Sequence, residues 1–203
     1  MMPEITTSFP MLAMVAIMGY LLGSVPFGIV MARVFGLGDL RQIGSGNIGA
    51  TNVLRTGNKP AALLTLLGDA GKGAAAVLLA RAFLAEDAAQ LAGFTAFLGH
   101  CFPIFLGFKG GKGVATWLGT MLALSWPIGL AACVTWLVVA VVFRISSLAA
   151  LSAAMLSPIL ALALGFPSYV LLSVALALLI FLRHRANIER LIAGDEPRIG
   201  AKK

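Results

Sequence analysis

Charged side chains are scarce in this chain, and their scarcity excludes most classes of soluble protein. Only 11% of the residues are charged, whereas a soluble domain carries about 25%. Hydrophobic residues make up 60% of the sequence, and the mean hydropathy is +0.97. The apolar residues form several separate runs of membrane-spanning length. This pattern predicts an all-α integral membrane protein.

Cysteines and metal ligands are also few. The two cysteines, Cys101 and Cys133, lie in different apolar segments without metal-ligand spacing. We expect both to be free thiols that pack as small apolar residues. The sequence offers no ligand set for a metal or a cofactor, so neither is expected. A net charge of +7 could indicate nucleic-acid binding, but the chain has no soluble basic face for it. The orientation of the protein in the bilayer explains the charge better.

The apolar runs predict seven membrane-spanning helices in a single polytopic domain, residues 1–203. Pro26 is expected to kink the first span, and Pro60 to begin the second. The fourth span is short enough to be re-entrant instead, which would change the count. The spans are expected at residues 10–35, 60–84, 88–106, 113–125, 127–143, 146–164 and 167–182, with polar loops at 36–59 and 107–113 and a tail at 183–203.

The cations of the connecting segments fall mostly on one side of these spans. The other side carries Arg81 together with Glu4, Glu86 and Asp87. Short loops rich in lysine and arginine stay in the cytoplasm. The sequence therefore predicts an external N-terminus and a cytoplasmic C-terminus. The cytoplasmic side would hold the basic tail from Arg183 and Arg33, Arg41, Arg55, Lys59, Lys109, Lys112 and Arg144.

A polar, glycine-dense stretch follows the first span at residues 43–58, IGSGNIGATNVLRTGN. The spacing of Gly44, Gly46 and Gly49 occurs in dinucleotide-binding folds, but there it follows a β-strand, and here a membrane helix precedes it. Glycines still allow backbone N–H groups to turn toward an anion. An ordinary connecting loop is the alternative. The side chains that would help to bind phosphate are Ser45, Asn47, Thr51, Asn52 and Arg55.

A second glycine-rich stretch, GFKGGKG at residues 107–113, precedes the fourth span. It lacks the serine or threonine that completes a P-loop, and no Mg²⁺ ligand accompanies it, so nucleotide hydrolysis is not expected. A flexible turn carrying the positive charge of a cytoplasmic loop is one interpretation. An anion site at a helix N-terminus is the other. It would be formed by Lys109, Gly110, Gly111, Lys112 and Gly113.

Ionisable residues also occur inside the predicted spans. Asp69 and Lys72 are three residues apart, a spacing that lets them pair. Ionisable groups within a span usually mark a polar pathway or site, so Lys72 is also a candidate phosphate contact. His100, near the end of the third span, is either a structural group with internal partners or a substrate-binding residue.

The C-terminal tail, HRANIERLIAGDEPRIG from His184, is basic and amphipathic. It is either a flank that lies on the bilayer surface or a contributor to a site. In a helix, His184 and Asn187 stand at positions i and i+3 on one face. Both are therefore candidate site residues.

Together, GSGNIGATNVLRTGN, GHCFPIFLGFKGGKGVAT and the tail resemble the three motifs of the bacterial acyl-phosphate:glycerol-3-phosphate acyltransferases of the PlsY type. The motifs occur in order, with hydrophobic spacers of fitting length. The resemblance implies a seven-span enzyme of the bacterial cytoplasmic (inner) membrane, with its active site on the cytoplasmic face. It implies transfer of a long-chain acyl group from acyl phosphate to the 1-hydroxyl of glycerol 3-phosphate, giving lysophosphatidic acid for phospholipid synthesis.

The resemblance also implies roles for single residues at matching positions. These are essential Ser45 and Arg55, glycerol-3-phosphate-binding Gly110, Gly111 and Lys112, His184 and Asn187 required for activity, and a structural glutamate at Glu189. An acyl phosphate is already activated, so the reaction needs no cofactor.

In the mechanism that we expect, five residues have separate roles. Arg55 and Lys112 would hold the phosphates, while Ser45 and Asn187 would orient the nucleophile and polarise the carbonyl. Either His184 is the general base, or an acyl-phosphate oxygen takes the proton. Besides the two substrates and membrane lipids, no obligate protein partner is evident. The alternatives are a small membrane transporter or channel for an anionic solute and a non-catalytic lipid-binding scaffold.

Overall fold

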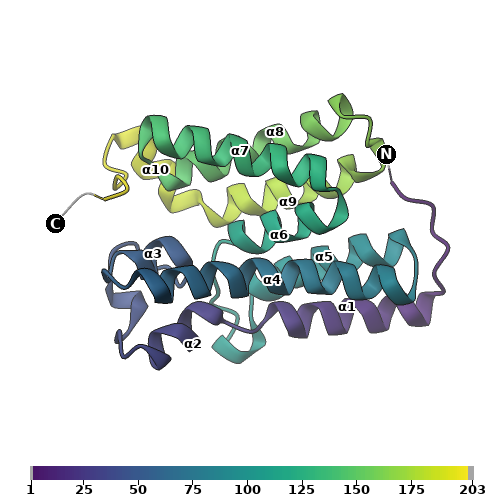
Figure 1. Cartoon of the computed structure of the whole chain (residues 1–203), viewed down its shortest axis with the longest axis horizontal. Helices are drawn as coiled ribbons and strands as arrows, with labels where there is room; N and C mark the ends of the chain where they lie inside the picture. The colour runs from purple at the N-terminus through teal and green to yellow at the C-terminus, as the bar shows by residue number, and fades with distance from the viewer. Residues whose placement is uncertain (1, 201–203) are drawn as a thin grey trace. The chain divides into compact units, whose positions relative to one another are not determined.

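The computed structural model describes residues 2–200, and all regular structure in that range is helical. The predicted all-α class is confirmed, while the last three residues of the predicted tail, 201–203, lie outside the described range. The helices gather into two compact units. One is Glu4–Leu124, and the other comprises the residues from Ser125 onward with residues 2–3. The helices of both units are labelled in Figure 1.

The first unit is built around α4 (Lys59–Phe83), the longest helix in the described chain. Two 3₁₀ turns, η1 (Leu40–Gln42) and η2 (Ile104–Leu106), lie in the polar connections. A second extensive contact joins α1 to α5. The helices that pack on α4 are α1 (Phe9–Gly23), α2 (Phe27–Val34), α3 (Ala50–Leu54), α5 (Glu86–Cys101) and α6 (Val114–Leu124).

Local sequence signals explain how these helices begin and pack. At the start of α4, the Asn58 side chain accepts a hydrogen bond from the Ala61 N–H at 2.9 Å, and Pro60 occupies the first turn. Glycine brings α1 close to α5, because a Cβ at Gly23 would overlap the Ala96 carbonyl. Small residues at a helix interface allow such an approach in membranes, where apolar burial alone does not drive association.

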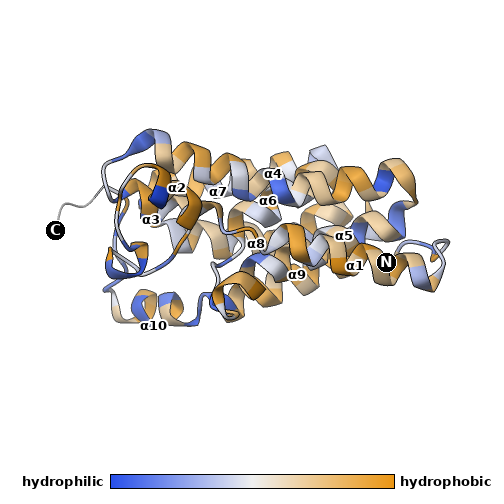
Figure 2. Cartoon of the chain, turned by 90° about the horizontal axis from the view of Figure 1, so that it is seen from below, coloured by the Kyte–Doolittle hydropathy of each residue, from blue (hydrophilic) through white to orange (hydrophobic). Residues whose placement is uncertain are grey.

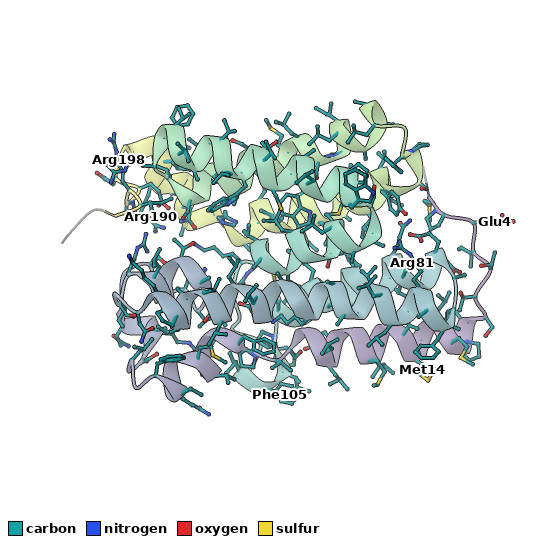
Figure 3. All side chains as sticks on the ribbon, viewed as in Figure 1. Glu4, Met14, Arg81, Phe105, Arg190 and Arg198 are labelled. Carbon is teal, nitrogen blue, oxygen red and sulfur yellow. The ribbon has the colours of Figure 1, made fainter. Side chains whose placement is uncertain are left out.

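Arg81, near the end of α4, holds the end of α6. Its guanidinium donates to the carbonyl oxygens of Ala123 at 2.6 Å and Leu124 at 3.0 Å. It also pairs with Glu86 at 2.9 Å. Arg81 is labelled in Figure 3. The last carbonyls of a helix have no partner within that helix, so Arg81 satisfies two of them.

The second unit contains α7 (Trp126–Phe143), α8 (Ser146–Ala163), η3 (Pro167–Tyr169), α9 (Val170–Arg183) and α10 (Arg185–Ala193). Helix α8 packs against both α7 and α9. Pro158 lies inside α8 and cannot donate to the Ala154 carbonyl. The Ser157 hydroxyl donates to that carbonyl at 2.8 Å instead, so the carbonyl is satisfied without water.

The number of spans differs from the sequence prediction. Five segments are long and apolar enough to cross a membrane, and the bent pair α9–α10 makes six if it counts as one span. The first span is interrupted at Pro26, as predicted, between α1 and α2. The predicted fourth span is only α6, whose 11 residues cover about 16 Å, against a hydrocarbon core of ~30 Å. The predicted count of seven is therefore not confirmed.

Hydropathy follows the same division between helices and connections. Within each unit, the long helices are mainly apolar, whereas polar residues gather in the connection before α3 and in α10 (Figure 2). Many large apolar side chains on the long helices are exposed, among them Leu67, Leu79, Leu137 and Leu178. Such surfaces suit contact with lipid tails rather than water.

Candidate functional site

One buried side chain organises the loop at residues 43–58. Asn52 is 2% exposed. Its Nδ2 donates to the carbonyls of Leu40 at 2.8 Å and Asn47 at 2.7 Å, and its Oδ1 accepts from the Ser45 N–H at 3.1 Å. Both amide hydrogens of Asn52 are thus used inside the loop. Its predicted contact with substrate stays a prediction, and the structure gives it a loop-building role.

Ser45 and Arg55 lie on the exposed side of this loop. The nearest side-chain contact of Arg55 is a long one, 3.4 Å from Nη1 to Asn52 Oδ1. Within residues 2–200, no carboxylate pairs with the Arg55 guanidinium. Gly44 has φ +55°, and a Cβ there would meet both Asn52 and Arg55. The arginine is therefore placed on the loop by packing, with its charge unneutralised.

The other predicted residues of this loop lie beside these. Gly46 has φ +67°, which favours glycine. Asn47 and Thr51 are half-buried, and the Asn47 side-chain oxygen accepts from the Ile48 N–H at 2.9 Å. The stretch is therefore a turn with polar groups on its surface.

The glycine loop, residues 107–113, continues the end of α5. The N–H groups of Gly110 and Gly111 donate to the carbonyls of Cys101 at 3.2 Å and His100 at 3.1 Å. These two amides are therefore not directed at an anion, contrary to the prediction that the glycine loop presents them. Gly113 has φ +81°, and a Cβ there would overlap the Phe97 ring. Close packing explains why this loop contains glycines.

The structure brings the two predicted loops of the first unit together. The Arg41 guanidinium, from the first loop, donates to the Lys109 carbonyl in the second at 3.1 Å. Phe105 and Phe108, in the segment that precedes Lys109, are exposed, and Phe105 points away from the helices (Figure 3). Ser45, Arg55 and Lys112 therefore lie on two loops that contact each other.

Three buried ionisable residues lie behind the glycine loop. Asp69, Lys72 and His100 are 2%, 3% and 5% exposed. Lys72 Nζ lies 3.1 Å from Asp69 Oδ1, which confirms the predicted pairing. His100 Nδ1 lies 3.4 Å from the same oxygen. Lys72 also donates to the Val25 carbonyl at 2.8 Å. The predicted contacts of Lys72 and His100 with substrate remain predictions.

In the second unit, the two predicted tail residues are buried at the junction of α9 and α10. His184 and Asn187 are each 3% exposed. His184 Nδ1 lies 2.8 Å from the Ile180 carbonyl. Because a carbonyl only accepts, Nδ1 carries the hydrogen, and a neutral ring then has its lone pair on Nε2. That tautomer suits a general base.

Glu196 is the residue that the sequence analysis missed. Its side chain is 6% exposed and accepts from Asn187 at 2.5 Å, Ser147 at 2.7 Å and Arg190 at 2.7 Å. Burial acts to raise the pKa of the Glu196 carboxyl, but these hydrogen bonds and the Arg190 charge outweigh burial and lower the pKa below its ordinary value. Figure 3 shows Arg190 at this end of the second unit.

The resemblance implied that Glu189 is the structural glutamate, and this is wrong. Glu189 is largely exposed, and its one ion pair within residues 2–200 is an i, i+4 contact with exposed Arg185 at 3.3 Å. Such a pair contributes little to stability. The tail reverses at Gly194, with φ +81°, and this turn directs Glu196 back to Asn187. In the sequence, the signal for this buried glutamate was Gly194 followed two residues later by Glu196 in an otherwise basic tail.

Neither cysteine forms a disulfide, as predicted, and Cys101 is buried whereas Cys133 is partly buried. Across residues 2–200, no group of three or more His, Cys, Asp or Glu side chains is arranged to hold a metal ion. The polar groups brought together are cations, hydroxyls and amides, which recognise anions.

Comparison with known proteins identifies the family. The family model described as glycerol-3-phosphate acyltransferase matches residues 13–194. The glycerol-3-phosphate acyltransferase of Jannaschia sp. (strain CCS1) is 72% identical over 200 residues, covering 98% of each chain. That of Dinoroseobacter shibae is 63% identical over 202 residues, covering 100% of each.

A solved structure agrees in fold as well as in sequence. The crystal structure of PlsY (YgiH), an integral membrane glycerol 3-phosphate acyltransferase in its glycerol 3-phosphate form, superposes with a TM-score of 0.88 at 39% identity. The match covers 93% of this chain and 96% of that one. The lysophosphatidic acid form of the same protein gives a TM-score of 0.84 at 36% identity. The chain belongs to the glycerol-3-phosphate acyltransferase family.

Proposed function

We propose that this chain transfers a long-chain acyl group from acyl phosphate to the 1-hydroxyl of glycerol 3-phosphate, giving lysophosphatidic acid and inorganic phosphate. The observation that carries the proposal is the pair of joined polar loops in an otherwise apolar unit, with Arg55 and Lys112 as cations. Both substrates are phosphate esters or anhydrides. Two cations on connected glycine-rich loops match that chemistry.

In the proposed reaction, Arg55 and Lys112 bind the phosphates. Arg55 suits this role because it is exposed and no carboxylate in residues 2–200 pairs with it. Asn52, Gly44 and Gly46 shape the first loop, with Asn47 and Thr51 beside it. Gly110, Gly111 and Gly113 shape the second. Ser45 then orients the glycerol hydroxyl.

The chemical step is acyl transfer by direct attack. The 1-hydroxyl oxygen forms a bond to the acyl carbonyl carbon, and the bond between that carbon and the phosphate oxygen breaks. The hydroxyl proton goes to His184 Nε2, the nitrogen left unprotonated by the Nδ1 contact with Ile180. Asn187 polarises the carbonyl. The competing route, in which an acyl-phosphate oxygen takes the proton, leaves His184 to orient the substrate.

We further propose seven crossings, with the N-terminus outside and both polar loops and the tail on the cytoplasmic face of the bacterial inner membrane. The bias of lysine and arginine toward one side supports this orientation. The five long spans and the α9–α10 pair supply six crossings. Helix α6 with residues 107–113 would complete the seventh, since extended backbone is tolerated at membrane depth where protein covers it.

The test is turnover by the purified protein in detergent. Glycerol 3-phosphate is supplied with palmitoyl phosphate or with palmitoyl-CoA, and lysophosphatidic acid is measured by mass spectrometry. Product from the acyl phosphate and little from the thioester is expected. Absence of product, or equal use of both donors, would refute the specific reaction. Arg55→Ala should abolish product while leaving the protein folded.

A further inference from the structure

A buried polar network connects the break in the first span with the glycine loop. Lys72 Nζ donates to the Val25 carbonyl at 2.8 Å, beside Pro26, and pairs with Asp69 at 3.1 Å. Asp69 Oδ1 in turn lies 3.4 Å from His100 Nδ1. The residues come from α4 and α5, which pack together (Figure 1). A charge in an apolar interior persists only with partners, and here each side chain has one.

The far edge of the His100 ring lies against the glycine loop. A Cβ at Gly111 would overlap His100 Nε2, and a Cβ at Gly110 would overlap the His100 carbonyl. Gly111 is not among the glycines with positive φ, so its backbone would accept alanine. The ring of His100 is therefore what excludes a side chain at Gly111. It also fixes how closely the loop approaches α5.

We propose that His100, held by Asp69, is the support on which the glycine loop rests, and that Asp69 and His100 are positioning residues for Lys112, whereas Lys72 only neutralises Asp69 and satisfies the Val25 carbonyl. None of the three needs to touch substrate. This inference rests on the proposed acyl transfer, in which Lys112 holds a phosphate. It differs from the expectation that Lys72 and His100 bind substrate directly.

Each member of the network has a distinct task. The Asp69 carboxylate lies 3.4 Å from Nδ1, an electrostatic contact that favours this orientation of the His100 ring. Lys72 neutralises the Asp69 charge and satisfies the Val25 carbonyl at the break. A tilt of the ring would move Gly111 and, with it, Lys112. Displacement of a phosphate-binding group by about 1 Å is enough to reduce the rate of a catalysed reaction by about a hundredfold.

The experiment is a double-mutant cycle on His100 and Gly111, read as the KM for glycerol 3-phosphate and as kcat. Gly111→Ala alone should raise KM about tenfold, because the new methyl group meets the ring. In a His100→Ala background, the same change should alter KM by less than about twofold, since the obstructing ring is gone. Equal effects of Gly111→Ala in both backgrounds would overturn the inference.

A second pair of variants keeps the test decisive if His100→Ala does not fold. Asp69→Asn combined with Lys72→Met removes both charges but keeps an oxygen of the same size beside His100 Nδ1. KM for glycerol 3-phosphate should then stay within about threefold of wild type, although the thermal midpoint falls because Val25 loses its donor. A tenfold or larger rise in KM would mean that Lys72 binds phosphate itself and would overturn the inference.

The matched control is Arg81→Met, which removes another cation bound to backbone carbonyls in the same unit. It should lower the thermal midpoint without changing KM. Wild-type turnover is measured in the same assay. A wild-type protein without turnover would refute the proposed function and this inference with it. If the wild type is active but the effects of His100→Ala and Gly111→Ala on KM are additive, this inference is refuted while the proposed function stands.

Discussion

Asn187 and Ser147, forty residues apart in the sequence, donate to the same oxygen of Glu196, at 2.5 Å and 2.7 Å. The carboxylate thus fixes a predicted catalytic amide against the start of α8. Removing it would leave the Asn187 amide without the acceptor that orients it. Glu196 is therefore a positioning residue within the second unit.

We expect Glu196→Ala to destabilise the protein by about 2–3 kcal/mol, because buried donors lose a charged acceptor. Product formation should fall at least tenfold with it. Thermal unfolding in detergent and initial rates measure the two effects. The control is Glu189→Ala, which removes the exposed pair with Arg185 and should change stability by less than about 0.5 kcal/mol. Equal losses in the two variants would contradict the structural assignment.

The lowered pKa of Glu196 predicts a pH dependence of stability. A carboxyl whose folded-state pKa lies below its unfolded value stabilises the fold above that unfolded value, which is about 4.3 for glutamate, and loses the contribution as pH falls through the folded pKa. The wild type should thus lose stability on acidification below about pH 4.3 more steeply than Glu196→Gln. Thermal midpoints across this range measure the slope. If the thermal midpoints of the wild type and Glu196→Gln fall equally with pH, Glu196 does not titrate as the structure requires.

Arg55→Lys should reduce kcat/KM for glycerol 3-phosphate by about ten- to a hundredfold, because lysine keeps the charge but loses the bidentate fork. Steady-state kinetics with acyl phosphate in excess provides the measurement. The control is Arg33→Lys, at an exposed position near the end of α2, for which we expect wild-type kinetics. An Arg55→Lys enzyme with wild-type kinetics would show that charge alone suffices.

Asn52→Asp should inactivate the enzyme through the loop rather than through substrate contact. Aspartate keeps Oδ1 as an acceptor but turns the two Nδ2 donations, to Leu40 and Asn47, into contacts between acceptors. We expect at least a tenfold loss of kcat/KM and faster proteolysis of residues 43–58. Thr56→Val, which removes a hydroxyl bond to the Val53 carbonyl in the same loop, is the control. Rapid loop cleavage only in the control would contradict this role of Asn52.

His184→Gln should separate the two proton routes. If Nε2 of His184 is the base, the activity of the wild type falls on the acidic side of its pH profile. The variant should then show no such fall and should be slower by about 10²–10⁴-fold. If the acyl phosphate takes the proton, both proteins share one profile shape. Rates measured at saturating substrate between about pH 5 and pH 9 distinguish the routes.

The helical class and the positions of the two loops were predictable because they depend on local composition. Apolar runs of spanning length define helices wherever lipid replaces water, and Asn58 with Pro60 marks the start of α4. The pairing of Asp69 with Lys72 followed from their spacing. These features need no knowledge of distant contacts.

The rest depends on contacts between segments that are far apart in the sequence. The N–H groups of Gly110 and Gly111 were expected to face an anion, but they bond to the end of α5, which composition does not reveal. Glu196 was missed because its partners include Ser147, in a different helix. The short α6 was counted as a span although its apolar run, residues 113–125, is shorter than the ~20 residues that a crossing needs.

The central claim is acyl transfer from acyl phosphate to glycerol 3-phosphate, and the stoichiometry of products tests it most directly. Lysophosphatidic acid and inorganic phosphate are measured together in a single time course with both substrates present. The proposed reaction predicts one phosphate released for each lysophosphatidic acid formed, and no phosphate release when glycerol 3-phosphate is withheld. Phosphate release without lysophosphatidic acid would instead show hydrolysis of the donor and would contradict the claim.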